Sequence, residues 1–182
     1  MGHGEGSVIT CIVGSVDHGR VMLGCDSMYC EGDDVLISSD PKAWRAGDWV
    51  IGAAGMVSWM DLLSKHMRWP KVTRRTADTV VRVEVPREIR RVAQETGTDL
   101  EDANGAALVG VHGRLYMVDS DLVVVSASEG YAAIGSGRQP AIGALYATRR
   151  AKLTQRTRMR MALESSERYC ASVRRPWRWV SV

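Results

Sequence analysis

Residues 8–26 read VITCIVGSVDHGRVMLGCD, and this stretch decides the fold because two short apolar runs flank one turn signal. The runs, Val8–Val16 and Arg20–Asp26, are rich in β-branched and small side chains, and Asp17-His18-Gly19 separates them. This pattern predicts a β-hairpin. Both faces of the two strands are apolar or small, which is typical of strands that are covered on both sides.

The rest of the chain contains further strand patterns, which alternate with segments of helical periodicity. A second hairpin is expected from Lys42–Arg45 and Trp49–Ala54, and Gly55 ends it. A helix with a methionine-rich core stripe follows and ends before Pro70. The later expected elements are a helix at Thr76–Thr96, strands at Ala106–Val111, Arg114–Val118, Leu122–Val125 and Tyr131–Ile134, helices at Arg138–Arg150 and Thr154–Ala171, and a last strand at Trp177–Val182.

The helix at Thr76–Thr96 competes with a second interpretation. Most of its apolar residues fall on one helical face. In contrast, Val81, Val83 and Val85 alternate as the residues of a strand do. Pro86 lacks the N–H that a helix interior uses, so it fits a helix there only if it begins a new one.

The order of elements is strands, two helices, strands, two helices and a last strand. It predicts two antiparallel sheets that pack face to face, with helices on both outer faces. The expected fold class is therefore α+β, a four-layer αββα sandwich. A chain of 182 residues fits one domain. We expect this domain to span residues 10–182, with residues 1–9 as a propeptide or an N-terminal extension.

Composition, with 45% apolar and 25% charged residues, is that of a globular protein. The longest apolar runs, such as Leu122–Val125, are far shorter than the roughly 20 residues that span a bilayer. The first nine residues lack the basic start and apolar run of a secretory signal. The four cysteines are too few and too uneven for a disulfide framework, and they form no zinc-binding pattern with the histidines. We therefore expect a cytoplasmic protein with no metal and no cofactor.

Charge is distributed unevenly along the chain. Residues 138–182 carry eleven Lys or Arg and two Glu, which leaves thirteen basic and nineteen acidic residues in the first 137. A basic half can bind nucleic acid, but a solvated helical face or an acidic partner subunit explains it equally well. No aromatic-interleaved RNA-binding motif accompanies the basic residues, so nucleic-acid binding is not expected.

Five short motifs in a fixed order resemble those of the proteasome β-subunits, which are N-terminal-nucleophile (Ntn) hydrolases. The motifs are Thr10-Cys11-Ile12-Val13, Gly24-Cys25-Asp26-Ser27, Lys42, Gly52-Ala53-Ala54-Gly55 and Gly135-Ser136-Gly137. The resemblance is closest to HslV-like members and extends from Thr10 nearly to the C-terminus. It includes the helix ALESSERYC near the end of the chain.

The resemblance implies that Thr10 is a nucleophile and that its own α-amino group is the base that activates it. Lys42 would supply an ammonium that lowers the pKa of this amine toward neutral pH. Asp26 would pair with Lys42 and keep it charged and oriented. The hypothesis requires this ammonium to lie on the strand beside Thr10.

The resemblance also implies supporting roles for four further residues. The N–H of Gly55, at a helix start, would donate to an oxyanion, and Ser136 would relay the proton of the amine. Gly52 and Ala53 would border the substrate, with the small Ala53 side chain at the floor of a specificity pocket. Such a pocket would admit a fairly large apolar side chain.

Two features depart from the family pattern. Thr10 is not the first residue, so the mechanism requires removal of residues 1–9. The residue before it is Ile9 instead of the usual Gly, and a β-branched residue resists the strained turn of self-cleavage. The late aspartate of the family also has no match, because the corresponding stretch is Cys170-Ala171-Ser172-Val173-Arg174.

Two other residues are alternative nucleophiles. Ser7 follows Gly6, as a processed nucleophile usually does, but it is three residues out of register with Thr10. Cys11 is displaced by one residue. An odd displacement turns a side chain to the opposite face of its strand, so both alternatives are disfavoured.

The sequence thus predicts a threonine peptidase that hydrolyses polypeptides through Thr10 inside a homo-oligomeric, self-compartmentalising ring. An AAA+ ATPase partner would feed it unfolded substrate. A first alternative is a catalytically inactive ring or assembly protein that keeps residues 1–9. A second alternative is an Ntn amidohydrolase that acts on a small amide.

Overall fold

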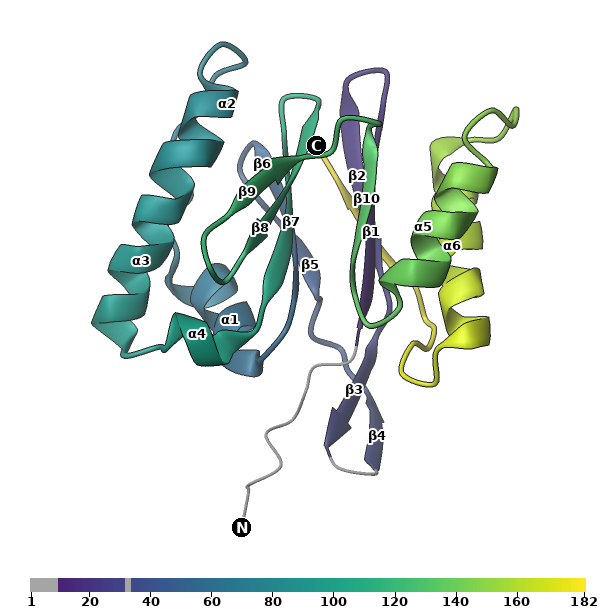
Figure 1. The fold of residues 1–182 in the computed structure, drawn as a ribbon, viewed down its shortest axis with the longest axis horizontal. Coiled ribbons are helices and arrows are strands. Elements are labelled where there is room, and N and C mark those ends of the chain that lie inside the picture. Colours follow the sequence, from purple (N-terminus) through teal and green to yellow (C-terminus); the bar gives the residue numbers. More distant parts are fainter. Residues whose placement is uncertain (1–9, 32–33) are drawn as a thin grey trace.

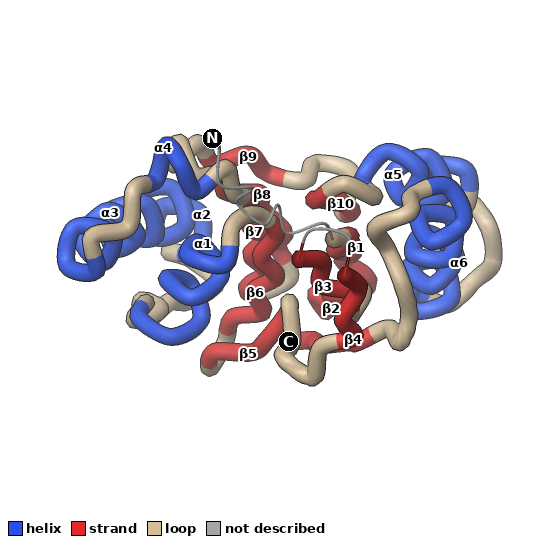
Figure 2. The backbone as a smooth tube through the Cα atoms, turned by 90° about the horizontal axis from the view of Figure 1, so that it is seen from below, coloured by secondary structure: helices blue, strands red, loops and turns tan. Residues whose placement is uncertain are grey.

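The structure is a computed structural model, and it describes residues 10–31 and 34–182. Two antiparallel sheets lie face to face, and helices cover the outer face of each (Figure 1). The view from below shows the same four layers, with α1 to α4 on one side and α5 and α6 on the other (Figure 2). The predicted αββα sandwich is confirmed.

The first sheet has the strand order β10-β1-β2-β11, and all its neighbours are antiparallel. Its strands are β1 (Cys11–Asp17), β2 (Arg20–Cys25), β10 (Tyr131–Gly135) and β11 (Arg178–Ser181). The predicted first hairpin is confirmed. His18 and Gly19 form its turn with φ values of 47° and 79°, in the left-handed region that glycine adopts without strain. The first two residues of the expected strand, Val8 and Ile9, lie outside the described residues.

The second sheet has the order β5-β6-β7-β8-β9. Its strands are β5 (Ala43–Ala46), β6 (Trp49–Ala54), β7 (Ala106–Val111), β8 (Arg114–Asp119) and β9 (Val124–Ser126). The predicted second hairpin is confirmed. Strand β9 begins at Val124 and not at Leu122 as expected, because Leu122 adopts a φ of 64° in the preceding turn. A separate hairpin of β3 (Met28–Glu31) and β4 (Asp34–Ile37) was not predicted.

The helical layers agree with the expected order of elements. On the second sheet lie α1 (Val57–Asp61), the π-helical turn η1 (Leu62–His66), α2 (Ala77–Thr79), the π-helical turn η2 (Val80–Glu84), α3 (Val85–Thr96) and the short α4 (Leu100–Ala103). On the first sheet lie α5 (Arg138–Ala147) and α6 (Gln155–Tyr169). In the part of the chain that the structure describes, no helix combines the length and apolarity needed to cross a membrane.

The segment with alternating valines is helical, so its interpretation as a strand is wrong. The N–H of Val85 donates to the carbonyl of Val80, which makes a wide π-helical turn just before Pro86. Pro86 then occupies the first turn of α3, where a missing N–H costs nothing. The wide turn therefore lets one helical segment pass a proline.

Strand alternation sorts the core into layers. Ile12 packs between the two sheets, whereas Cys11 and Val13 pack against α5 and α6. Thr10 precedes β1 and has the same parity as Ile12, so its side chain is directed toward the inter-sheet layer. The hairpin sequence thereby decides on which side of the strand the threonine hydroxyl lies.

Candidate active site

Asp26 is the centre of a buried polar cluster. It follows β2, and its backbone N–H donates to the Cys11 carbonyl at 3.2 Å, which extends the pairing with β1. Its Oδ1 accepts hydrogen bonds from the Thr10 hydroxyl at 2.6 Å and from the Cys11 N–H at 3.0 Å. Its Oδ2 accepts from the Met28 N–H at 3.0 Å. Because Thr10 and Asp26 are both 0% exposed, these bonds form in a low-dielectric interior.

Lys42 supplies the positive charge of this cluster. Its Nζ lies 3.1 Å from each oxygen of Asp26, donates to the Met28 carbonyl, and lies 4.8 Å from the centre of the Tyr29 ring. The side chain is 0% exposed. An ammonium in such a place keeps its charge only when a carboxylate and further acceptors hold it. The pair Lys42–Asp26 meets that condition.

The position of Lys42 corrects one expectation. Lys42 directly precedes β5, which belongs to the second sheet, and is not on a strand beside Thr10. Its side chain nevertheless reaches the carboxylate oxygen that accepts the Thr10 hydroxyl. The threonine and the lysine therefore approach Asp26 from the two sheets of the sandwich.

The Gly135-Ser136-Gly137 motif holds the Thr10 carbonyl. The Ser136 hydroxyl donates to that carbonyl at 3.2 Å, and the Gly137 N–H donates to it at 3.3 Å. Gly135 has a φ of 88°, and a Cβ built there would lie 2.2 Å from the same oxygen. A residue with a side chain at position 135 would displace Thr10, so the glycine is required for this close approach.

Two residues near Thr10 were not predicted. Ser172 and Ser136 share a hydrogen bond between their hydroxyls at 3.1 Å, and the Cys170 thiol lies 2.9 Å from the Ser172 hydroxyl. Burial alone would raise the pKa of Cys170, but hydrogen bonds with Ser172 outweigh it and the net pKa is lowered. Both residues belong to the stretch in which the family aspartate has no match. No sequence signal marks them, because an isolated Ser or Cys has no periodicity or spacing to recognise.

Gly55 follows β6 and does not open the helix directly. Met56 is the N-cap of α1, and the helix begins at Val57. Gly55 has a φ of 134°, and a Cβ there would lie 2.5 Å from the Cα of Gly105. The position thus needs glycine for its backbone conformation and for its contact with the neighbouring loop.

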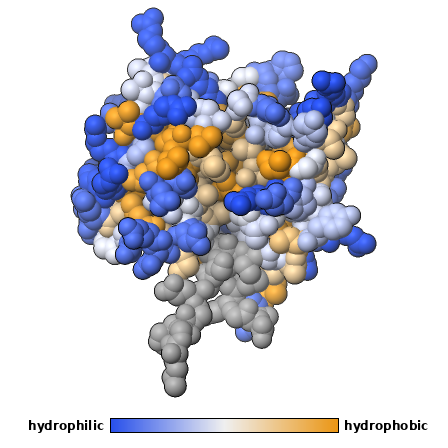
Figure 3. Space-filling view, viewed as in Figure 1, coloured by the Kyte–Doolittle hydropathy of each residue, from blue (hydrophilic) through white to orange (hydrophobic). Residues whose placement is uncertain are grey.

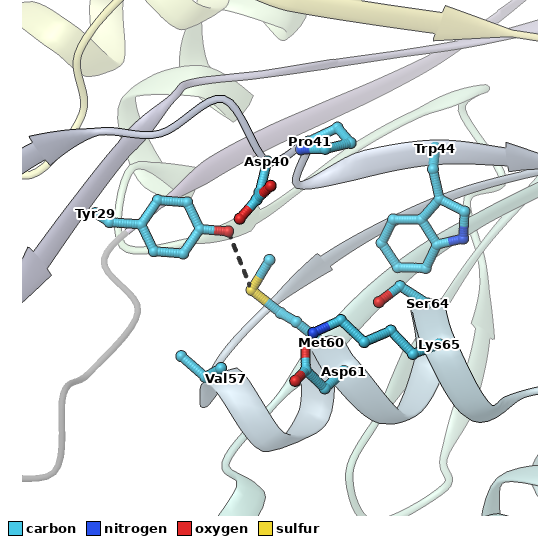
Figure 4. Close-up of a pocket in the computed structure, with 9 residues that line it drawn as sticks. All are labelled: Tyr29, Asp40, Pro41, Trp44, Val57, Met60, Asp61, Ser64 and Lys65. Atoms are coloured by element: carbon cyan, nitrogen blue, oxygen red, sulfur yellow. Dashed lines mark hydrogen bonds and ion pairs between the residues drawn. The ribbon is translucent and has the colours of Figure 1, made fainter.

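A pocket of about 430 Å³ lies next to the cluster (Figure 4). It is lined by Tyr29, Asp40, Pro41, Trp44, Val57, Met60, Asp61, Ser64 and Lys65. Tyr29 connects it with the cluster, because the same ring lies over the Lys42 ammonium. Pro41 also directly precedes Lys42 in the chain.

Gly52 and Ala53 are not among the residues that line this pocket, and their predicted place beside the substrate stays a prediction. Ala53 is fully buried among the residues that pack under the helices of the second sheet. Its N–H donates to the Lys42 carbonyl at 2.9 Å and thereby holds the start of β5. A Cβ at Gly52 would lie 2.8 Å from the Ile12 side chain, so this glycine allows the two sheets to approach each other.

The alternative nucleophile Cys11 faces the wrong layer. Its Sγ contacts the Ser166 hydroxyl of α6 at 3.3 Å. Burial raises the pKa of the Cys11 thiol to about 12, so the thiol is protonated at neutral pH. The other alternative, Ser7, lies outside the described residues.

Comparison with protein-family models and with curated proteins gives no match, whereas solved structures match almost the whole chain. BPH from Thiobacillus denitrificans, solved in complex with epoxomicin, has a TM-score of 0.80 at 17% identity and covers 95% of this chain and 98% of its own. HslV from Trypanosoma brucei has a TM-score of 0.70 at 23% identity and covers 94% and 98%. Anbu (ancestral β-subunit) from Yersinia bercovieri has a TM-score of 0.70 at 14% identity and covers 95% and 81%.

At these identities the likeness establishes the fold. The fold is that of the proteasome-like class, the Ntn type of αββα sandwich. Within that class it is HslV-like, as the sequence motifs predicted.

Proposed function

We propose that the protein is a threonine-type peptidase subunit of a proteasome-like ring, with Thr10 as its nucleophile after removal of residues 1–9. One observation carries the proposal. Inside a fully buried cluster, the Asp26 carboxylate accepts hydrogen bonds from both the Thr10 hydroxyl and the Lys42 ammonium. This arrangement places a hydroxyl directly beside a fixed carboxylate–ammonium pair, where the proposed nucleophile needs it. The motif order of the sequence and the HslV-like fold support the same assignment.

The proposed reaction begins when the α-amine of Thr10 is free. The amine takes the proton of Oγ1 while this oxygen attacks the carbonyl carbon of a substrate peptide bond. The N–H of Gly55 donates to the oxyanion that forms. The C–N bond then breaks, the amine returns the proton to the leaving nitrogen, and an ester on Thr10 remains. Water, deprotonated by the same amine, hydrolyses this ester.

The remaining residues of the cluster assist the amine in this proposal. The Lys42 ammonium lowers the pKa of the α-amine, so that the amine is an unprotonated base near neutral pH. Asp26 holds Lys42 charged and orients the Thr10 hydroxyl. Ser136 fixes the Thr10 carbonyl, and in this proposal it also relays the proton of the amine.

Assembly into a homo-oligomeric ring, fed by an AAA+ ATPase, is the second part of the proposal. Apolar side chains are exposed at Val123, just before β9, at Val125 on β9, and at Ile142 and Tyr146 on α5. Apolar surface also gathers in the middle of the face that Figure 3 shows. The basic residues after Arg138 provide a charged contact for a neighbouring subunit or partner.

The test is the intact mass of the purified assembly together with the site of covalent inhibition. We expect a chain that begins at Thr10, cleavage of unfolded polypeptides, and an adduct on Thr10 after treatment with epoxomicin, the ligand of the BPH structure. Thr10→Ala should abolish both cleavage and adduct, whereas Cys11→Ala should retain both. An adduct on Ser7 or Cys11 would overturn the assignment of the nucleophile.

An inactive ring or assembly protein is the competing candidate, and the presence of Ile9 before Thr10 favours it. A purified assembly whose chains all keep residues 1–9 and take no label supports this candidate. Cleavage of a small amide by an unassembled, processed chain supports instead the third possibility, an amidohydrolase.

A further inference from the structure

The pocket beside Lys42 has walls that suit a long aliphatic stem. Trp44 and Pro41 line one part of it, and Val57 and Met60 of α1 line another, with the Met60 sulfur beside the Tyr29 hydroxyl (Figure 4). Its volume of about 430 Å³ lies in the range of pockets that enclose small ligands. The pocket can therefore take a whole large side chain of a peptide.

The charged groups of the pocket do not balance. Lys65 forms an ion pair with Asp61 at 2.8 Å, so these two charges offset each other. Asp40 is the third charged residue of the lining. Among the residues that the structure describes, no hydrogen bond or ion pair holds its carboxylate, and only its backbone N–H is bound, to the Ser38 hydroxyl at 3.0 Å. The lining thus carries one uncompensated negative charge.

Tyr29 does not add to this charge at neutral pH. Burial, followed by the nearby charge of Asp40, raises the pKa of the Tyr29 hydroxyl to about 12. The hydroxyl stays protonated and lies 4.0 Å from the Met60 sulfur. Asp40 is therefore the acidic group that remains available to a ligand.

We propose that this pocket binds a cationic side chain of the substrate, arginine or lysine, and that Asp40 is the residue that selects it. The proposal rests on the proposed peptidase function for the position of the cleaved bond, which follows the residue held in the pocket. It replaces the expectation of a fairly large apolar side chain, which depended on Ala53 as the floor.

The selection follows from the partners that each side chain offers to Asp40. An apolar side chain would displace water from the carboxylate and give no hydrogen bond in return. A guanidinium offers planar donors to the carboxylate, and its stem and flat face pack against Trp44 and Met60. Arginine is therefore expected to bind better than lysine, and both better than leucine or glutamate.

The first test compares the cleavage of peptides that differ only in the residue before the cleaved bond. We expect a higher kcat/KM for Arg than for Leu, and Asp40→Asn should lower the Arg-to-Leu ratio by roughly 5- to 10-fold, the effect of about 1 kcal/mol. Asp48→Asn is the matched control, because Asp48 is exposed in the turn between β5 and β6 and does not line the pocket. A ratio that Asp40→Asn leaves unchanged overturns the proposal while the peptidase function stands.

A second test does not depend on catalysis. In the purified chain with Thr10→Ala, Trp fluorescence reports binding of peptides that end in Arg or in Leu. The Arg peptide should bind several-fold more tightly, with an advantage that salt reduces and Asp40→Asn removes. Equal binding of both peptides overturns the proposal. Tighter binding of the Arg peptide, together with a processed chain that keeps Thr10 and still cleaves neither peptide, counts against the peptidase function alone.

Discussion

Thr10 and Cys11 are neighbours in the chain, are both 0% exposed, and belong to two different chemical environments. The Thr10 hydroxyl donates to a carboxylate that is itself paired with an ammonium. The Cys11 thiol points to the other side of the strand and contacts the neutral hydroxyl of Ser166 in α6. One step along a strand thus separates a polar cluster from a helix-packing core.

Burial alone does not produce a reactive side chain. Cysteine is the stronger intrinsic nucleophile, yet desolvation raises the pKa of Cys11 to about 12 and keeps it inert. Threonine is the weaker nucleophile, but Asp26 and Lys42 surround it with fixed charges. Strand parity therefore decides which of the two side chains faces these charges.

The largest expected effect comes from removing the charge on the Thr10 side of this comparison. Lys42→Met leaves the Asp26 carboxylate buried without its counter-charge, and breaking a buried ion pair in this way typically costs about 3–5 kcal/mol. We expect the free energy of unfolding in urea to fall by that amount and peptidase activity to be lost.

Lys65→Met is the matched control, because Lys65 forms an exposed ion pair with Asp61. It should lower the free energy of unfolding by less than about 1 kcal/mol. The double variant Asp26→Asn, Lys42→Met should recover part of the stability without activity. If the free energies of unfolding of Lys42→Met and Lys65→Met are equal, Lys42 and Asp26 do not form a buried ion pair.

A smaller effect is expected at Thr10 itself. Thr10→Val keeps the shape but removes the donor to Asp26, so the free energy of unfolding should fall by about 1–3 kcal/mol, the cost of one unsatisfied buried partner. Activity should disappear. Thr10→Ser restores the hydroxyl and should retain measurable activity, which a purely structural role of the threonine does not predict.

Much of the fold was predictable because the layers follow from periodicity. The strands β1 and β2 are apolar on both faces, and helix α6 has a regular apolar stripe. These patterns predict from the sequence that the three elements are buried. The β3–β4 hairpin was missed because the residues of β4 are exposed and show no alternation that a core imposes. The segment around Pro86 was ambiguous because a π-helical turn has no sequence period of its own.

The candidate site was predictable only where a motif marked it. Thr10, Asp26 and Lys42 were chosen by resemblance, and they meet in space although they come from two sheets. Asp40 and Ser172 could not be chosen, because only the folded chain brings them to the pocket and to Ser136. Residues that act through tertiary contacts alone leave no local pattern in one sequence.

Stability at alkaline pH tests whether the Cys11 thiol is buried as strongly as the structure shows. Burial raises the pKa of Cys11 and of Cys25 to about 12, from an ordinary value of 9.0. Between pH 9 and pH 12 the unfolded chain has lost these two protons while the folded chain keeps them. The contribution of the two buried thiols to the free energy of unfolding is therefore full below pH 9 and falls as the pH rises toward 12. Each thiol contributes a slope of at most about 1.4 kcal/mol per pH unit.

Urea unfolding at a series of alkaline pH values measures this slope. The double variant Cys11→Ala, Cys25→Ala should be less stable at neutral pH but show a flatter decline. Cys170→Ala is the control, since the pKa of that thiol is lowered and it adds nothing to the decline above pH 9. Equal slopes in the double variant and the unmodified chain would show that neither thiol is desolvated.

The smallest expected effect lies at Ser136, which touches Thr10 through its carbonyl and not through the Asp26 cluster. Ser136→Ala removes one partly buried hydrogen bond to the Thr10 carbonyl, while the Gly137 N–H still donates to it, so the free energy of unfolding should fall by only about 1 kcal/mol. If Ser136 also relays the proton of the amine, kcat should fall by about 10-fold or more with little change in KM, a typical share of general acid–base assistance. Ser172→Ala removes the partner of Ser136 without touching Thr10, and it should lower kcat less than Ser136→Ala does. A Ser136→Ala chain with unchanged kcat would limit this motif to holding the backbone of Thr10, and the chemical contrast with Cys11 would then rest on Asp26 and Lys42 alone.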